Sequence, residues 1–332
     1  MDVSIVKVEQ QSSPNKLLIN YAIHNVCNYK CWYCFPGSNT GEHRWPDLDV
    51  VANNFIQLLK YYKTHLNKSQ FELNLLGGEP TMWPELGNFI KILKLEFGKD
   101  IQIRITTNAS RTIRWWSEHS RYFDKVLISC HPNEADENHI IAVADLLYIA
   151  PVYVDVIVLM DPTVWDRAID IVQNLKKSKK TWSIQTSQVI HNSIKYNAEQ
   201  TTYLESYVKR RPNLFWYWST SKNFNYKNKL HFDNGEVIGI KKNYLLFNNL
   251  NHFKGWECNI GVDNILINFD GRLSANCGEN LYKLPISYNL YDKNFVNMFH
   301  PKLVPTICTK EGCYCEHEIN TTKQVIPIKL IG

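Results

Sequence analysis

The sequence contains no apolar run of the roughly 20 residues that a membrane-spanning helix needs. Its first residues, Met1–Gln11, are mostly polar and lack the apolar segment of a secretory signal peptide. Internal repeats are missing as well, and no low-complexity tract is long enough to indicate disorder. We therefore expect a cytoplasmic protein that does not span a membrane.

Blocks of like charge are also missing. The 37 Lys and Arg residues and the 32 Asp and Glu residues are spread along the whole chain. A net charge of +5 distributed in this way is too weak to indicate a nucleic-acid-binding protein. With 332 residues, 44% of them hydrophobic, the chain can bury a normal core and has room for one large and one small domain.

Cysteine, in contrast, is plentiful. In a reducing cytoplasm, the nine cysteines are better explained as metal ligands than as disulfides. Eight of them fall into two groups, at positions 27–34 and 258–315, with Cys130 alone between the groups. Cys130 is expected to be a buried core thiol.

The first group, Cys27, Cys31 and Cys34, places three thiols within eight residues, separated by three residues and then by two. This spacing lets a short loop offer three thiolates to one compact inorganic body, as the cysteine runs of iron–sulfur proteins do. Structural zinc is the alternative, but it takes four protein ligands and only His43 follows closely. A cubane with one iron left open is therefore favoured over zinc.

Cys-x3-Cys-x2-Cys with an aromatic residue before the last cysteine resembles the signature of the radical S-adenosylmethionine (radical SAM) enzymes. The resemblance implies that SAM chelates the open iron of a 4Fe–4S cluster through its amino and carboxylate groups. It also implies that Tyr33 lies against the adenine of SAM.

Between the two cysteine groups, strand and helix patterns alternate, and Asp47 is a plausible cap for the first helix. The predicted strands are 16–23, 71–76, 101–105, 126–129, 152–159 and 181–189, and the predicted helices are 47–62, 84–97, 112–119, 137–148, 163–175 and 198–210. Six such alternations predict an α/β fold with a parallel sheet, which right-handed crossovers curl toward a barrel. The resemblance likewise implies a partial (β/α)6 barrel of the TIM type.

In such barrels the chemistry lies at the carboxyl ends of the strands. Gly77-Gly78-Glu79-Pro80 follows the second predicted strand and matches the family's Gly-Gly-Glu-Pro motif, which holds the amino group of SAM. Two glycines let a backbone approach a ligand closely, and a carboxylate accepts charge-assisted hydrogen bonds from an ammonium group. Alone, these four residues would indicate an ordinary strand-to-helix turn. Their position after the cysteines makes Gly77, Gly78, Glu79 and Pro80 candidates for SAM binding.

Asn108, after the third strand, and Ser129, at the end of the fourth, resemble positions at which the family contacts polar groups of SAM. Asn108 is equally well placed to cap the helix that follows it. His131 is interpreted as a loop residue close to the substrate. Three further polar residues become candidates for substrate contacts if they point into the barrel: Asp155, Gln185 and Gln188.

The second group comprises Cys258, Cys277, Cys308, Cys313 and Cys315. Cys258-x12-Gly271-x5-Cys277 resembles the opening of the SPASM/Twitch extension, where a hairpin separates two ligands of an auxiliary 4Fe–4S cluster; here Asp270-Gly271 supplies the turn. Five residues separate Gly271 from Cys277 where the family usually has four, and the full pattern needs seven cysteines rather than five. The resemblance therefore implies one auxiliary cluster, with one of the last three cysteines spare. A four-cysteine zinc site is the alternative.

We expect an N-terminal extension over residues 1–16, the partial barrel over 17–212 and a small auxiliary iron–sulfur domain with a β-hairpin over 213–332. The short stretch before the first predicted strand leaves no room there for a peptide-recognition domain. A second turn signal in the last domain is Asp233-Asn234-Gly235.

The resemblance implies that an electron from a reductant such as flavodoxin or ferredoxin breaks the C5′–S bond of SAM. The resulting 5′-deoxyadenosyl radical abstracts a hydrogen atom from the substrate. The substrate is open between a small molecule, such as a sugar or nucleotide derivative, and a peptide delivered by a separate carrier protein. The competing hypothesis is a non-catalytic scaffold that binds zinc through the same thiols.

Overall fold

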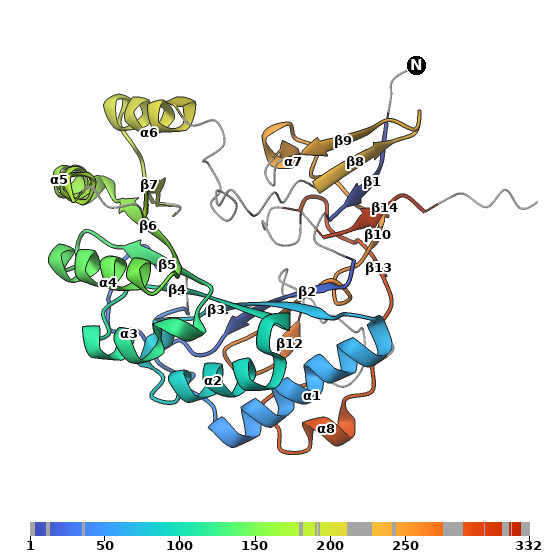
Figure 1. Ribbon diagram of the computed structural model, residues 1–332. Coiled ribbons are helices and arrows are strands. Elements are labelled where there is room, and N and C mark those ends of the chain that lie inside the picture. The colour runs from blue at the N-terminus through green and yellow to red at the C-terminus, as the bar shows by residue number, and fades with distance from the viewer. Residues whose placement is uncertain are drawn as a thin grey trace, which may run out of the picture.

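The protein is represented by a computed structural model of residues 1–332. The residues that the structure describes are 4–10, 14–34, 37–178, 182–189, 191, 193–210, 228–240, 244–274, 288–301, 303–313, 319 and 321–326. They contain one sheet of eight strands and one of six. In Figure 1, helices line the outer side of the larger sheet, and the smaller sheet stands on the side away from them.

Six parallel strands form most of the larger sheet, and the chain visits them in spatial order from β2 to β7. The strands are β2 (Lys16–Ala22), β3 (Gln70–Leu76), β4 (Ile101–Thr107), β5 (Lys125–Cys130), β6 (Tyr153–Met160) and β7 (Ser183–Gln188). The helices that follow them are α1 (Leu48–Leu66), α2 (Leu86–Phe97), α3 (Ile113–His119), α4 (Glu137–Ile149), α5 (Trp165–Lys177) and α6 (Ala198–Arg210). The predicted α/β fold with a parallel sheet, consistent with a partial TIM barrel, is thus confirmed.

Local signals explain where these helices begin. The Asp47 side chain accepts a hydrogen bond from the Val50 amide and caps α1, as predicted. Helix α3 is capped by Thr112, whose side chain accepts from the Trp115 amide, so the alternative that Asn108 caps this helix is wrong. Among the residues that the structure describes, four single-turn 3₁₀ helices also occur: η1 (Pro80–Met82), η2 (Gly98–Asp100), η3 (Ser120–Tyr122) and η4 (Pro162–Val164). No helix within the described residues combines the length and apolar character that crossing a membrane requires.

The two faces of the larger sheet differ in polarity because side chains alternate along each strand. The face beneath the helices is apolar: Leu17, Ile19 and Tyr21 of β2 are fully buried in a core that includes Phe55 of α1 and Phe89 of α2. Fully burying a side chain of this kind contributes about 1.5–3 kcal/mol. This apolar face therefore fixes which side of every strand points toward the helices.

The opposite face is polar although it is buried. Neighbouring strands place Asn20, Asn74 and Arg104 side by side in register, and the Asn74 amide donates to Asn20 Oδ1 at 3.1 Å. Glu72 forms ion pairs with Arg104, at 2.5 Å, and with Lys16. Each buried charge in this row thus meets an opposite charge, which is the condition under which burying charges is tolerated.

The larger sheet is completed by residues from the C-terminal part of the chain. Strand β11 (Asn264–Ile267) pairs in parallel with β2, and β12 (Leu273–Ser274) returns antiparallel to β11. The hairpin predicted at Asp270-Gly271 is confirmed, but its place beside β2 was not predicted. Gly271 has φ +82°, and a Cβ there would lie 2.4 Å from Asn289 Oδ1, so glycine is required in this turn.

The smaller sheet contains strands from the N-terminal and the C-terminal parts of the chain. Its strands, in spatial order, are β13 (Thr306–Ile307), β10 (Glu257–Cys258), β14 (Lys323–Gln324), β1 (Ile5–Glu9), β8 (Asn228–Phe232) and β9 (Val237–Ile240). The turn predicted at Asp233-Asn234-Gly235 connects β8 to β9, as expected. The strand predicted as the first of the chain is in fact the second, because β1 precedes it and pairs with β8 and β14. Two short helices lie in the same part of the chain, α7 (Tyr244–Phe247) and α8 (Phe295–Met298).

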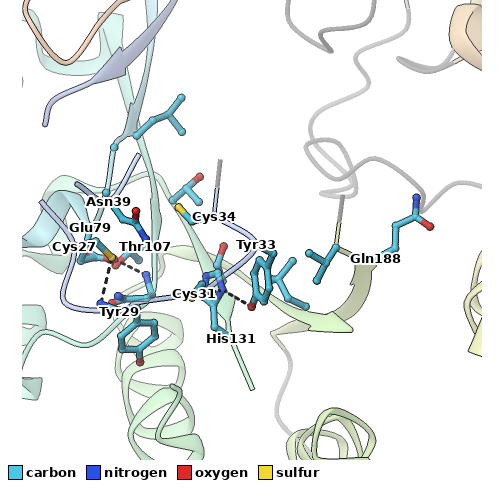
Figure 2. Close-up of a pocket in the computed structure, with 18 residues that line it drawn as sticks. Cys27, Tyr29, Cys31, Tyr33, Cys34, Asn39, Glu79, Thr107, His131 and Gln188 are labelled. Carbon is cyan, nitrogen blue, oxygen red and sulfur yellow. Dashed lines mark hydrogen bonds between the residues drawn. The ribbon is translucent and has the colours of Figure 1, made fainter. Parts of the chain in front are cut away.

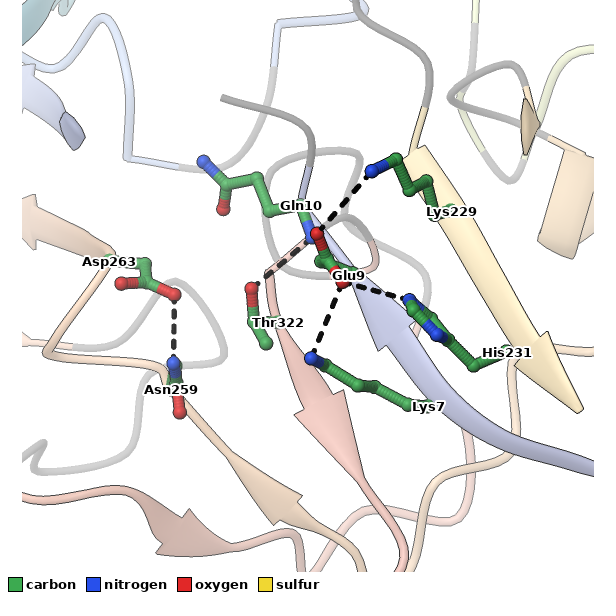
Figure 3. A network of polar contacts seen from close by, with 8 residues as sticks. All are labelled: Lys7, Glu9, Gln10, Lys229, His231, Asn259, Asp263 and Thr322. Carbon is green, nitrogen blue, oxygen red and sulfur yellow. Dashed lines mark hydrogen bonds and ion pairs between the residues drawn. The ribbon is translucent and has the colours of Figure 1, made fainter. Parts of the chain in front are cut away.

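A cluster of charges fastens β1 to its neighbours in the smaller sheet (Figure 3). Glu9 Oε2 lies 2.8 Å from His231 Nε2 and 3.3 Å from Lys7 Nζ, and Glu9 Oε1 lies 3.8 Å from Lys229 Nζ. Burial alone would raise the pKa of Glu9, but attraction to Lys7 and hydrogen bonds to Lys7 and His231 outweigh it and hold this pKa below its usual value. The ionised carboxylate therefore stabilises the folded state.

Glu9→Gln is expected to lower the free energy of unfolding by roughly 0.5–1 kcal/mol at neutral pH. Because the folded-state pKa lies below the unfolded one, the contribution of Glu9 is complete above the unfolded-state pKa and disappears as the pH falls through the folded-state pKa. Urea unfolding of both proteins across this acidic range measures the difference. Glu236→Gln, in the exposed β8–β9 turn, is the control, and equal effects of the two substitutions would contradict the prediction.

Candidate active site

A cavity of about 420 Å³ opens at the carboxyl ends of the parallel strands (Figure 2). It collects side chains from the loop after β2, the loop after β3 and the ends of β4, β5, β6 and β7. The predicted site residues that line it are Cys27, Cys31, Tyr33, Cys34, Gly77, Gly78, Glu79, Asn108 and Ser129. Residues far apart in the sequence therefore meet where the parallel-sheet prediction placed them.

The cysteine loop lies along one side of this cavity with all three thiols partly buried. The Cys34 amide donates to the Cys31 carbonyl at 3.1 Å, and the Tyr29 amide donates to Cys27 Sγ at 3.4 Å. Burial raises the pKa of the Cys27 thiol and raises the pKa of Cys31 to about 12. Both thiols are consequently protonated at neutral pH until a metal displaces the proton.

These thiols fit an iron–sulfur cluster better than a single metal ion. Within the described part of the chain, no three His, Cys, Asp or Glu side chains are grouped closely enough to hold one ion. A mononuclear zinc site needs four converging ligands. A cubane, in contrast, has iron at four corners, so its soft thiolate ligands need not converge on one point.

The cysteine loop is anchored to the end of β6 by Asp161. This carboxylate is fully buried, and its Oδ2 accepts hydrogen bonds from Trp32 Nε1 at 2.9 Å and from Asn133 Nδ2 at 2.8 Å. Its Oδ1 accepts from the amide and the hydroxyl of Thr163, which start η4. The sequence analysis missed Asp161, whose only signal was its position two residues after a predicted strand.

Tyr33 lies against His131 on the same side of the cavity. The two rings stack with centroids 5.9 Å apart, and Tyr33 Oη lies 2.9 Å from His131 Nδ1, which is itself 3.4 Å from Cys31 Sγ. Burial lowers the pKa of His131 to about 4, so the imidazole is neutral at pH 7, and burial raises the pKa of Tyr33. His131, predicted to be a loop residue near the substrate, therefore lines the cavity between the cysteine loop and β5.

The loop after β3 packs directly onto the chain that leads into the cysteine loop. The Gly78 amide donates to the His24 carbonyl at 2.9 Å, and the Glu79 amide donates to the Val26 carbonyl at 2.8 Å. A Cβ on Gly77 would lie 2.5 Å from the His24 carbonyl oxygen, and one on Gly78 would lie 2.3 Å from that of Val26. Both glycines are therefore needed for backbone-to-backbone packing, a reason separate from any ligand.

Glu79 is a buried carboxyl group that joins this loop to the end of β4. Its Oε1 accepts from the Thr81 amide and hydroxyl and from the Thr107 hydroxyl, at 3.1, 2.6 and 2.6 Å, and its Oε2 accepts from the Asn108 amide at 2.6 Å. Burial raises the pKa of Glu79, and these hydrogen bonds oppose the rise. Pro80 is buried at the start of η1 and is not among the residues that line the cavity.

Asn108 and Ser129 complete the predicted set. The Asn108 side chain donates to Asn28 Oδ1 at 3.0 Å and accepts from the Ser110 amide at 2.9 Å, so it links the cysteine loop to the loop after β4. Ser129 lines the cavity from β5. Further lining residues that the sequence analysis did not assign are Tyr29, Asn39, Leu76, Thr106, Thr107, Leu159 and Val189.

Asp155, Gln185 and Gln188, the three candidates for substrate contacts, lie in different environments. Gln188 lines the cavity, whereas Asp155 and Gln185 are buried and do not line it. Asp155 lies 2.6 Å from Lys125 Nζ; burial raises the pKa of this carboxyl group and Lys125 opposes the rise. Of the three, Gln188 alone is placed to contact a molecule in the cavity.

Of the second cysteine group, the structure describes Cys258, Cys308 and Cys313, whereas Cys277 and Cys315 fall outside the described residues. Cys258 of β10 is paired with Thr306 of β13, and the Cys308 amide donates to the Trp256 carbonyl at 2.8 Å. The Cys313 amide donates to the Asn251 carbonyl at 2.8 Å. Three cysteines from separate segments are thereby held on neighbouring elements.

Comparison with known proteins identifies the part of the chain that contains the cavity. Residues 21–184 match the family model of the Radical SAM superfamily. These residues form a radical SAM domain. The radical SAM family implies a 4Fe–4S cluster, SAM and an external reductant.

The curated relatives match over short stretches. An S-adenosylmethionine-dependent nucleotide dehydratase of Fibrobacter sp. (strain UWH6) is 33% identical over 94 residues, which cover 28% of this chain and 28% of that protein. The nucleotide dehydratase RSAD2 of Oncorhynchus mykiss is 30% identical over 138 residues, 40% of this chain and 37% of that protein. A GTP 3′,8-cyclase of Campylobacter lari is 30% identical over 92 residues, 28% of this chain and 27% of that protein. The chain therefore spans less than two fifths of the length of these relatives.

Solved radical SAM structures share the fold over most of the chain. Native anSMEcpe with bound AdoMet has a TM-score of 0.51 at 16% identity and covers 86% of this chain and 81% of its own. Streptococcus suis SuiB bound to precursor peptide SuiA has a TM-score of 0.52 at 14% identity, with coverages of 86% and 65%. At these identities the likeness concerns the fold alone.

Asp161→Ala is expected to loosen the cysteine loop, because Trp32 and Asn133 lose their shared acceptor while the helices that carry the core are untouched. Losing hydrogen bonds to a buried carboxylate costs about 1–3 kcal/mol, so local opening should increase roughly tenfold or more. Hydrogen exchange of a peptide that covers residues 27–34, followed by mass spectrometry, measures this opening. Asp166→Ala, an exposed residue of α5, serves as the control, and equal exchange in the two variants would refute the anchoring role.

Proposed function

We propose that the cavity holds a 4Fe–4S cluster and SAM, and that the enzyme uses them to abstract a hydrogen atom from a polar substrate. The observation that supports this most is the meeting of the cysteine loop, the Gly-Gly-Glu-Pro loop and the ends of β4 and β5 around one cavity. When bound, the cluster supplies the electron that breaks the C5′–S bond of SAM, and the 5′-deoxyadenosyl radical released takes hydrogen from the substrate.

The three cysteines of the loop would hold the cluster. Cys27, Cys31 and Cys34 are soft donors on one short loop, and they leave a fourth iron for SAM. Asp161 keeps this loop against β6 through Trp32, so the ligands are presented from a fixed position. Partial burial of the thiols limits the access of water to the site.

The Gly-Gly-Glu-Pro loop would hold the amino group of SAM. Glu79 lines the cavity, and its Oε1 already accepts three hydrogen bonds whereas Oε2 accepts one, so Oε2 has more capacity to accept from an ammonium. Gly77 and Gly78 keep the loop close to the cysteine loop, and Pro80 starts η1 and so fixes the exit of the loop.

The remaining contacts are divided between SAM and substrate. Tyr33 is proposed to face the adenine, and Asn108 and Ser129 to contact polar groups of SAM, as in the family. His131 and Gln188 line the part of the cavity nearest β5 and β7, and we assign that part to the substrate. Hydrogen-bonding groups there suit a polar molecule, and curated relatives named for nucleotide chemistry favour a nucleotide derivative over a peptide.

The C-terminal part of the chain would hold a second 4Fe–4S cluster, with its ligands drawn from Cys258, Cys277, Cys308, Cys313 and Cys315. Cys258 and Cys313 are buried and Cys308 is partly buried on adjoining segments, which gives a set of soft donors shielded from water. We also propose that the boundary between the partial barrel and the auxiliary domain lies near residue 212.

Iron analysis tests the two cluster sites together. Anaerobically reconstituted protein should contain about eight iron and eight sulfide, and a variant with Cys27, Cys31 and Cys34 all replaced by Ala should retain about half. Stoichiometric zinc without visible absorption in the unmodified protein would refute both sites. Cys130→Ala is the control, because this thiol is buried in the apolar core and should leave the iron content unchanged.

Glu79→Ala should retain both clusters but bind SAM roughly tenfold to a hundredfold more weakly, because an ammonium loses its charged acceptor. The measurement is the formation of 5′-deoxyadenosine with dithionite at limiting and at saturating SAM. Thr107→Val is the matched control, since it removes one hydrogen bond to Glu79 and keeps the carboxylate. Glu79→Ala that cleaves limiting SAM like the unmodified enzyme, or no worse than Thr107→Val, would refute this role.

A further inference from the structure

Two tyrosines of the cysteine loop hold the imidazole of His131 in place. The His131 ring stacks on Tyr33 with centroids 5.9 Å apart, and it makes an edge-to-face contact with Tyr29 at 6.0 Å. Tyr29 stands two residues before Cys31 in the sequence, and Tyr33 stands two residues after it. The imidazole is therefore fixed against the middle of the loop, where Cys31 lies between the two tyrosines.

The backbone of His131 is fixed as well. Its carbonyl accepts hydrogen bonds from the amides of Glu134 and Ala135, both at 2.9 Å, and these bonds close a turn directly after β5. A group that is already held in place loses little conformational entropy when it forms a further hydrogen bond. His131 is thus preorganised toward whatever its ring nitrogens contact.

The Nδ1 atom of His131 reaches the thiol of Cys31. It lies 3.4 Å from Cys31 Sγ, within the range of hydrogen bonds to sulfur, and 2.9 Å from the hydroxyl oxygen of Tyr33 (Figure 2). A thiolate bound to iron has no proton and can only accept, whereas a tyrosine hydroxyl can accept or donate. Once Cys31 is a thiolate, a proton on Nδ1 has an acceptor in Sγ, so the tautomer that carries its proton on Nδ1 is favoured.

We propose that His131 donates a hydrogen bond from Nδ1 to the Cys31 ligand of the SAM cluster and raises the reduction potential of that cluster. This inference deepens the proposed function and rests on it. The external reductant adds one electron to the cluster, which makes the ligand sulfurs more negative. A hydrogen bond to a ligand sulfur therefore stabilises the reduced form more than the oxidised form. In this role His131 acts through Cys31, while its ring still lines the substrate part of the cavity.

The test compares variants of the whole chain by a redox titration followed by electron paramagnetic resonance. The signal that remains when Cys27, Cys31 and Cys34 are all replaced by Ala is subtracted, so that only the cluster on the cysteine loop is followed. His131→Phe keeps an aromatic ring between the two tyrosines and removes the N–H donor, so its midpoint potential should be more negative. At a fixed potential the ratio of reduced to oxidised cluster should fall about tenfold, which equals 59 mV for one electron.

Three further variants separate this hydrogen bond from packing, from the tyrosine hydroxyl and from the mere loss of a histidine. His131→Asn keeps an N–H donor near the position of Nδ1 and should restore a midpoint close to that of the parent. Tyr33→Phe removes the other side-chain donor near Cys31 and should leave the midpoint unchanged. His119→Phe should also leave it unchanged, because this histidine donates to the Trp115 carbonyl instead. If His131→Phe does not retain the cluster, His131→Leu replaces it in the same comparison.

A midpoint that is the same with Phe or Leu as with His at position 131 would overturn the role of His131 and leave the cluster on the cysteine loop intact. So would a midpoint in His131→Asn as low as that in His131→Phe, which would show an effect of packing alone. An equal fall in Tyr33→Phe or in His119→Phe would also overturn the proposal. If replacing the three cysteines removes no part of the signal, the proposed site of the SAM cluster fails, and the inference fails with it.

Discussion

The arrangement of the candidate active site depends on the buried carboxyl group of Glu79. Its four hydrogen bonds join the loop after β3 to the end of β4, and each hydrogen bond to a charged group stabilises by about 1.5–3 kcal/mol. The same loop is bonded to the backbone before the cysteine loop. The Glu79 side chain, two backbone hydrogen bonds and the hydrogen bond from Asn108 to Asn28 therefore join the three loops that carry the proposed ligands of SAM and iron.

Local patterns in the sequence were enough to predict the parallel part of the fold. The strands of the larger sheet from β2 to β6 are apolar on one face, and each helix from α1 to α6 has its own cap or apolar stripe. Strands β1 and β11 were not predicted to lie where they do, because their partners lie more than 200 residues away in the sequence. The two-residue strands β10, β13 and β14 are too short to carry a period.

The candidate active site shows the same difference between features that local motifs predict and features that depend on distant residues. Cysteine spacing and Gly-Gly-Glu-Pro are local motifs, and the parallel sheet brings them together as predicted. Asp161 acts through contacts with Trp32 and Asn133 that only the tertiary structure creates. Asp155 could not be assigned to a face in advance, and its partner Lys125 comes from a neighbouring strand. The spacing of residues in the sequence therefore did not predict the roles that depend on a residue distant in the chain.

One pair of strands lies between Cys27 of the first cysteine group and Cys258 of the second. Cys27 follows the carboxyl end of β2, whereas Cys258 precedes the amino end of β11, which runs parallel to β2 in register from Asn264 to Ile267. A strand rises about 3.3 Å per residue, so the seven residues of β2 separate the two ends by roughly 20 Å. The strand that follows Cys258 therefore pairs directly with the strand that leads into the cysteine loop, and Cys27 and Cys258 lie toward opposite ends of this pair.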